Sequence, residues 1–151
     1  MKNKKYIYTS AMGKNMDNNE NLEKEIMEKL LAKKEQVDTD LLSIADRLSG
    51  VFKIEESGEV LFSDFSSLDD DQKMLALLTG KFFAARWGLI NSERMRITDI
   101  AKVLARPRQT LSARIENLRK KGLVSRDTTD GRYYIDKNRL KDIVQQITKG
   151  M

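Results

Sequence analysis

Polar and cationic side chains are concentrated in one short stretch, ARPRQTLSARIENLRKKGLV, which spans residues 105–124. Leu111, Ile115 and Leu118 recur at helical spacing, so one face of a helix from about 108 to 121 should be buried. The opposite face of this helix collects Gln109, Ala113, Glu116, Asn117 and Lys120. Small or hydrogen-bonding side chains of this kind suit the major groove of double-stranded DNA, and Gln109 could hydrogen-bond to base edges. The alternative is a solvated cationic face that only covers a core.

Further hydrogen-bonding and cationic side chains lie along the flanks of the same helix, and they could contact phosphates. They are Arg108, Thr110, Ser112, Arg114 and Arg119. Arg106, in the turn before the helix, adds another cation beside them.

The elements around this stretch determine how it is held. A short helix with one apolar face is expected over ITDIAKVLA, and it should end before Pro107. Gly122 stops the following helix. Two β-like runs, 123–126 and 132–135, flank a turn containing Asp130-Gly131, which predicts a hairpin. A last helix is expected from about 137 to 148.

The preceding segment, about 69 to 87, predicts a helix that is apolar over more than one face and therefore buried on two sides. Its aromatic residues Phe82, Phe83 and Trp87 favour a core over a ligand site. Before it, residues 51–54 and 60–62 predict a second hairpin, either a small structural sheet or one wall of a ligand pocket.

The N-terminal part divides into a polar tail and a helical segment. Residues 1–19 are polar and asparagine-rich, so we expect them to be disordered. An apolar stripe from Leu22 to Val37 and a second helix from about Asp38 to Leu48 follow. The stripe could be a dimer seam or could pack on the domain. We therefore predict a tail (1–19), a segment for dimerisation or partner binding (20–68) and a C-terminal domain (69–151).

Composition excludes several classes of protein. The chain of 151 residues has no cysteine and no histidine, which argues against disulfides, the usual zinc sites and most nucleophile and base pairs. We expect no enzyme activity, cofactor or metal. Without an apolar run that could span a membrane, a cytoplasmic protein is expected. Residues 91–151 hold fifteen basic and seven acidic residues, a difference of +8 against +5 for the whole chain.

The motif ITDIAKVLARPRQTLSARIENLRKKGLVSRDTTDGRYYI, within residues 69–148, resembles the winged helix-turn-helix superfamily, notably small regulators of the MarR, ArsR and Lrp kind. Those families show I-x-D-I-A-x-x-L in the second helix, T-x-S-x-x-I-x-x-L followed by G-L-V in the recognition helix, and R-x-Y-x-I in the wing. The resemblance implies a mostly α fold with small β-hairpins (α+β), here with an N-terminal helical extension and an extra hairpin. The chain departs from the pattern at Ala105-Arg106, where a glycine is usual, and in two wing-tip aspartates.

Carried over by position, the resemblance implies groove-facing or phosphate-facing places for seven residues of the recognition helix. These are Arg108, Gln109, Thr110, Ser112, Ala113, Arg114 and Asn117. It also implies that Arg126 and Arg132 flank the wing, about 123–135. We therefore expect a sequence-specific regulator that binds double-stranded DNA as a homodimer. The alternative is a winged-helix interaction adaptor, or an accessory subunit of a nucleic-acid-processing complex, with a protein partner bound through residues 20–68.

Overall fold

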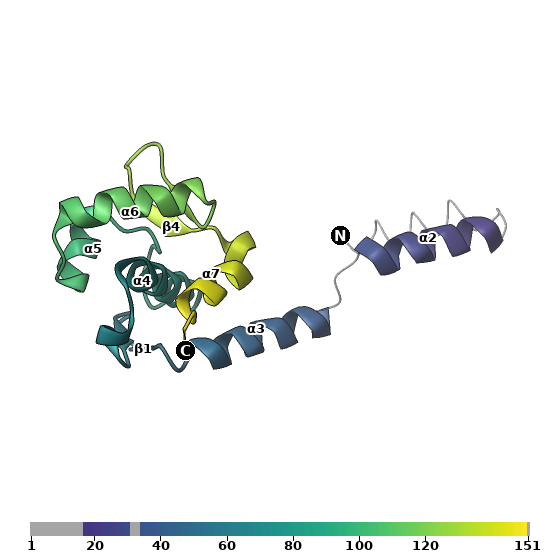
Figure 1. Ribbon diagram of the computed structural model, residues 1–151. Coiled ribbons are helices and arrows are strands. Elements are labelled where there is room, and N and C mark those ends of the chain that lie inside the picture. The colour runs from purple at the N-terminus through teal and green to yellow at the C-terminus, as the bar shows by residue number, and fades with distance from the viewer. Residues whose placement is uncertain (1–16, 31–33, 151) are drawn as a thin grey trace. The chain divides into compact units, whose positions relative to one another are not determined.

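The computed structural model describes residues 17–30 and 34–150, and in these residues it is mostly helical with two small antiparallel hairpins (Figure 1). The first hairpin follows two helices: α2 (Asp17–Leu30), α3 (Lys34–Leu48), β1 (Phe52–Ile54) and β2 (Val60–Phe62). The remaining elements are η1 (Phe65–Ser67), α4 (Asp70–Arg86), α5 (Ile97–Leu104), α6 (Arg108–Lys120), β3 (Val124–Arg126), β4 (Tyr133–Ile135), η2 (Lys137–Arg139) and α7 (Leu140–Ile147). The predicted α+β class is confirmed.

The N-terminal helices differ from the sequence prediction in their ends. Residues 17–19, assigned to a disordered tail, form the first turn of α2, while residues 1–16 lie outside the described residues. The apolar stripe used to place the start begins only at Leu22, and such a stripe locates helix ends poorly. The second helix begins at Lys34 and not at Asp38, because the Lys-Glu-Gln run that precedes Val37 has good helix propensity.

The chain divides into two compact units, Met1–Leu41 and Leu42–Met151. The second unit includes the β1–β2 hairpin, which the sequence analysis had grouped with the N-terminal segment. Ile44 and Leu48, at the end of α3, are buried in this unit. Arg47 donates a hydrogen bond of 2.6 Å to the Thr148 hydroxyl after α7. The end of α3 is therefore anchored to the chain's last helix.

Helix α4 is the centre of the larger unit and contacts α5, α6, α7 and strands of both hairpins (Figure 1). Met74, Leu75, Leu77 and Leu78 are each at most 1 % exposed, as the apolar sequence on several faces predicts. The helix begins with a capping box in which the Asp69 carboxylate accepts a hydrogen bond from the Gln72 backbone N–H (2.8 Å), and the Gln72 side chain accepts one from the Asp69 N–H (2.9 Å).

The two hairpins pack differently. In the first, Phe52 pairs with Phe62, and Phe52 is buried against the core. In the second, Val124 pairs with Ile135, and Met95 adds two backbone hydrogen bonds to Tyr133, of 2.9 and 2.7 Å. The second hairpin is thereby tied to the segment that leads into α5.

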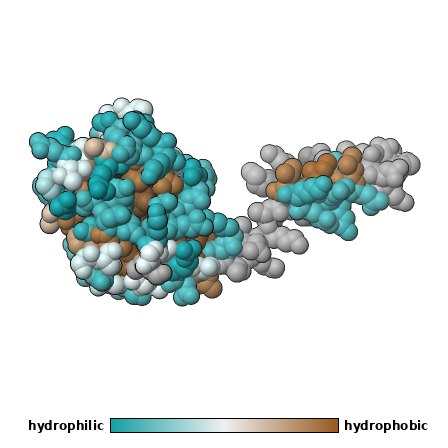
Figure 2. Space-filling model, in the orientation of Figure 1, coloured by the Kyte–Doolittle hydropathy of each residue, from teal (hydrophilic) through white to brown (hydrophobic). Residues whose placement is uncertain are grey.

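Helix α2, taken by itself, carries an exposed apolar stripe. Leu22, Ile26, Met27 and Leu30 are between 38 and 81 % exposed. They gather along one side of the helix, with hydrophilic side chains on the other (Figure 2). No helix among the described residues has the length and apolarity needed to cross a membrane. Whether this stripe is a dimer seam stays a prediction.

Candidate nucleic-acid interface

The turn between α5 and α6 sets the direction of the cationic helix. Helix α5 ends at Ala105, whose φ of 53° lies in the left-handed region. Glycine is usual at such a position, and an alanine there costs on the order of 1 kcal/mol. The Arg106 N–H then donates to the Ala101 carbonyl (3.1 Å), and Pro107 adopts the extended conformation at the N-cap of α6. The tight turn predicted from the sequence is therefore formed without glycine.

Packing fixes which face of α6 is available. Leu111, Ile115 and Leu118 are at most 2 % exposed and pack into the core, as predicted. On the opposite face Gln109, Ala113, Asn117 and Lys120 are exposed. This burial pattern leaves a continuous polar face on the helix.

The predicted site residues fall into two groups by exposure. The exposed ones are Arg106, Arg108, Gln109, Ala113, Arg114, Asn117, Lys120 and Arg126. Thr110, Ser112 and Arg132 are half-buried. The Ser112 hydroxyl donates to the Arg108 carbonyl (2.9 Å), which leaves the oxygen as an acceptor.

Four of the exposed side chains make no hydrogen bond or ion pair with any other residue that the structure describes. They are Arg108, Gln109, Asn117 and Lys120. Two of them are amides, which carry both donors and acceptors, and two are cations. This part of α6 combines groups suited to base edges with groups suited to phosphates.

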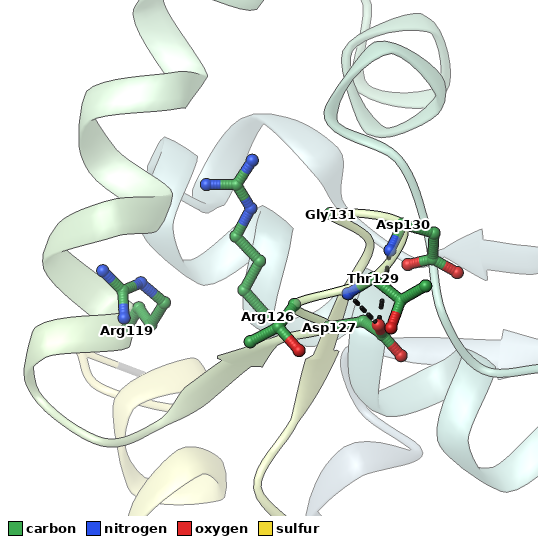
Figure 3. Close-up of a pocket in the computed structure, with 7 residues that line it drawn as sticks. Arg119, Arg126, Asp127, Thr129, Asp130 and Gly131 are labelled. Atoms are coloured by element: carbon green, nitrogen blue, oxygen red, sulfur yellow. Dashed lines mark hydrogen bonds between the residues drawn. The ribbon is translucent and has the colours of Figure 1, made fainter.

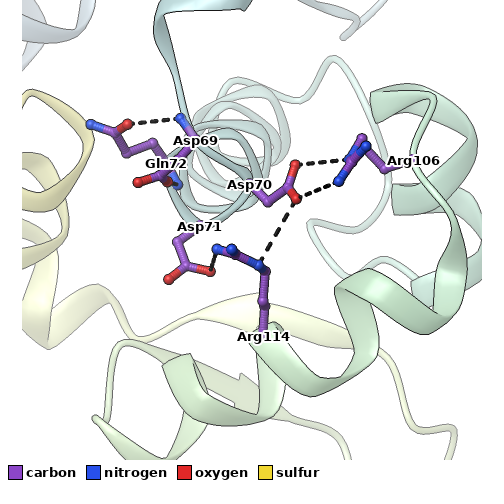
Figure 4. A network of polar contacts seen from close by, with 6 residues as sticks. All are labelled: Asp69, Asp70, Asp71, Gln72, Arg106 and Arg114. Carbon is purple, nitrogen blue, oxygen red and sulfur yellow. Dashed lines mark hydrogen bonds and ion pairs between the residues drawn. The ribbon is translucent and has the colours of Figure 1, made fainter.

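Arg106 and Arg114, by contrast, are both paired with carboxylates at the start of α4 (Figure 4). Arg106 donates through Nε and Nη2 to the two oxygens of Asp70, each at 3.1 Å. Arg114 reaches Asp71 Oδ1 through Nη1 at 3.3 Å, and its Nε lies 3.9 Å from Asp70 Oδ2. These two arginines therefore differ from Arg108 and Lys120, which make no ion pair with other described residues.

A second network joins the C-terminal half of α6 to β4. Arg119 forms a two-nitrogen pair with Glu116, with Nη2 at 2.9 Å from Oε1, and the Tyr133 hydroxyl donates to Glu116 Oε2 (2.9 Å). The hydrogen bonds from Arg119 and Tyr133 lower the pKa of the Glu116 carboxyl below its usual value. Burial, followed by the bond to Glu116, raises the pKa of Tyr133. The hydrogen bond from Tyr133 to Glu116 therefore fixes α6 to the hairpin.

The two acidic side chains at the tip of the second hairpin, Asp127 and Asp130, have partners within the chain. The Asp127 carboxylate accepts backbone hydrogen bonds from Thr129 (2.7 Å) and Asp130 (3.3 Å) and pairs with Arg94. The bond from the Thr129 N–H is the main reason why the pKa of Asp127 is lowered. Asp130 lies 3.8 Å from Arg132. Both aspartates of the hairpin tip therefore have cationic partners within the chain.

An open hollow of about 560 Å³ lies between α6 and this tip (Figure 3). Arg119 enters its lining from α6 and Arg126 from the end of β3. Arg126 stacks over the Tyr133 ring, 5.5 Å from the ring centre, and makes no ion pair within the described part of the chain. It is the predicted hairpin residue best placed to meet an anion, whereas Arg132 is half-buried and paired.

A second, apolar hollow of about 240 Å³ lies away from α6. Its wall includes Leu48, Phe52, Ile54, Phe83 and Trp87. Trp87 is 59 % exposed, and Phe82 and Phe83 are half-buried. The prediction that this aromatic group is core was therefore wrong for Trp87 and only partly met by the two phenylalanines. The hairpin packs on the core through the buried Phe52, and Ile54 lines the hollow. That this hollow binds a ligand stays a prediction.

Sequence reasoning missed Asp70, Asp71 and Tyr133 as partners of the cationic helix. Acidic residues at 69–71 are favourable at the positive end of the α4 dipole, which explains their presence without any partner. Nothing in their local pattern indicates which arginine they meet. The Glu116 to Arg119 spacing of three residues was a readable signal for the third pair.

Comparison with known proteins adds no relative, since no protein-family model, curated protein or solved structure matches the chain.

Proposed function

We propose that the protein is a sequence-specific regulator of transcription that binds double-stranded DNA, with α6 in the major groove and the β3–β4 hairpin as a wing. The observation that carries the proposal is the accessible surface of α6, where Gln109, Asn117 and Lys120, opposite the core, and Arg108, on the flank, are exposed and unpaired among the described residues. Two amides can discriminate base edges and two cations can neutralise phosphates.

The arrangement of elements supports a winged helix-turn-helix. Helix α5, a three-residue turn and α6 are followed directly by a hairpin that packs on α4 and α6. The bonds between Met95 and Tyr133 tie this hairpin to the start of α5. A hairpin supported in this way is rigid enough to serve as a second contact beside the recognition helix.

We propose further that the regulator acts as a cytoplasmic homodimer without catalytic residues. One helix reads few base pairs, and a twofold pair doubles the contact. The exposed stripe of α2, from Leu22 to Leu30, supplies an apolar surface for such pairing.

A second candidate is an interaction adaptor, and one observation favours it. Several arginines near α6 are engaged by carboxylates of the same chain, which reduces the cations available to a polyanion. An adaptor would bind its partner through the apolar stripe of α2 and would show only weak, unselective affinity for DNA.

The test is selection of duplexes from a randomised double-stranded library, followed by fluorescence anisotropy on one selected and one scrambled duplex. The variant Gln109→Ala with Asn117→Ala removes two amides without changing charge. Gln145→Ala with Gln146→Ala is the matched control, because it removes two exposed amides from α7.

The proposal predicts a strong preference of the wild-type protein and the α7 control for the selected duplex. The α6 variant should lose about tenfold or more of that preference, as expected for one or two base contacts. Failure of the wild-type protein to enrich any duplex would refute the regulator and favour the adaptor. Equal behaviour of the α6 and α7 variants would show that α6 does not read the sequence.

A further inference from the structure

The carboxylate of Asp70 lies where α4 begins, and it faces the turn that leads into α6. Its side chain is only 11 % exposed. Arg106 approaches it as a fork, with both nitrogen to oxygen distances at 3.1 Å. Such a two-point contact fixes orientation as well as distance. Since Arg106 belongs to the turn itself, the contact holds the entrance of α6 against α4.

Arg114 reaches the same place from within α6. Its Nε lies 3.9 Å from Asp70, and its Nη1 donates to Asp71. Two guanidinium groups, one from the turn and one from the second turn of the helix, thus meet at one carboxylate (Figure 4).

Both arginines keep an exposed side. The side chain of Arg106 is 43 % exposed and that of Arg114 is 45 % exposed. A guanidinium has five N–H donors. The contact to Asp70 occupies the Nε–Nη2 edge of Arg106, whereas Arg114 uses Nε toward Asp70 and Nη1 toward Asp71. The nitrogens not bound to the carboxylates, Nη1 of Arg106 and Nη2 of Arg114, remain free to donate to another anion.

We propose that Asp70 is a positioning residue, which holds Arg106 through its Nε–Nη2 edge and lies beside the Nε of Arg114, so that the remaining N–H groups of both arginines are presented to DNA phosphates beside the groove that α6 enters. This inference rests on the proposed function. Arginines that are held in advance lose less side-chain freedom on binding than free ones. The Asp70 carboxylate should therefore strengthen DNA binding, although it is negatively charged like the DNA phosphates.

Net charge alone predicts the opposite change in DNA affinity. Replacing Asp70 by asparagine makes the protein more positive, and a more positive protein should bind a polyanion more tightly. The direction of the change in affinity for Asp70→Asn therefore distinguishes positioning from plain neutralisation. Asp99→Asn is the matched control, because Asp99 is exposed on α5 and its side chain makes no hydrogen bond or ion pair with other described residues.

The experiment measures the dissociation constant for a selected duplex at two salt concentrations. We expect Asp70→Asn to bind about tenfold more weakly than the wild-type protein, and Asp99→Asn to bind as tightly or more tightly. Asp70→Glu keeps the charge but moves the carboxylate, and it should bind about threefold more weakly or worse. Because it preserves the ion-pair chemistry, this variant tests positioning even where Asp70→Asn does not fold.

A double-mutant cycle with Arg106→Gln separates positioning from a general loss of structure. If Asp70 acts through Arg106, Asp70→Asn should add little in the Arg106→Gln background. Tight binding by Asp70→Asn and Asp70→Glu, or full additivity in the cycle, would overturn the inference while the regulator stands. A wild-type protein that prefers no duplex would overturn the regulator and the inference with it.

Discussion

Gly80 lies close to the first hairpin, and its replacement by alanine tests the packing directly. A Cβ at this position would lie 2.4 Å from Val60 Cγ2 and 3.2 Å from Val60 Cγ1, with Phe52 Cε1 at 3.4 Å. The first distance is far inside van der Waals contact. Val60 is β-branched and stiff at χ1, so rotation of its side chain cannot relieve the contact. The hairpin would have to move away from α4.

Two opposing terms determine the magnitude. Alanine in place of glycine inside a helix contributes about 1 kcal/mol of stability. Overpacking a buried contact costs about 1 to 3 kcal/mol, and the shortness of the first contact puts Gly80→Ala near the upper end. The free energy of unfolding should therefore fall by about 2 kcal/mol. For a unit of this size, the midpoint temperature should fall by about 8 °C.

Urea unfolding followed by far-UV circular dichroism, together with calorimetry, measures both quantities. The same substitution in a Val60→Ala background provides the control, because the clashing methyl groups are absent there. In that background Gly80→Ala should be neutral or stabilising by up to about 1 kcal/mol. A rise in the midpoint temperature for Gly80→Ala alone would refute the packing argument.

Two further predictions concern α6. Ile115→Ala empties a fully buried site and should lower the free energy of unfolding by about 3 kcal/mol, measured by urea titration. Glu116→Gln should lower stability at neutral pH, because the bonds from Arg119 and Tyr133 depress the carboxyl pKa and stabilise the fold above the unfolded value of 4.5. The difference from wild type should shrink as the pH falls through the lowered pKa; a constant difference in midpoint temperature between neutral and acid pH would contradict this.

The buried face of α6 and its neighbours could be predicted from the sequence because their signals are local. Leu111, Ile115 and Leu118 define one stripe at helical spacing. Pro107 and Gly122 mark where this helix begins and ends. The Asp130-Gly131 turn indicates the hairpin. All of these depend on neighbours a few residues away, and the structure bears them out.

The partners of the cationic side chains could not be predicted in the same way. Asp70 and Arg106 are 36 positions apart in the chain, and Asp71 and Arg114 are 43 apart. Their meeting depends on how α4 packs against α5 and α6. In the sequence alone, Arg106 and Arg114 look equivalent to Arg108. Of these three arginines, only Arg108 makes no ion pair with another described residue.

This difference changes what the charge of the C-terminal part implies. Six arginines after residue 90 pair with carboxylates: Arg94, Arg106, Arg114, Arg119, Arg132 and Arg139. Under the proposed function, these carboxylates offset part of the positive charge, so affinity should depend less on salt than the count of basic residues suggests, even with Arg106 and Arg114 at phosphates. Nonspecific attraction should then be weak, and the proposal assigns discrimination to the amides of α6. A protein built to select a sequence benefits from this balance, because binding to every duplex alike would compete with its target.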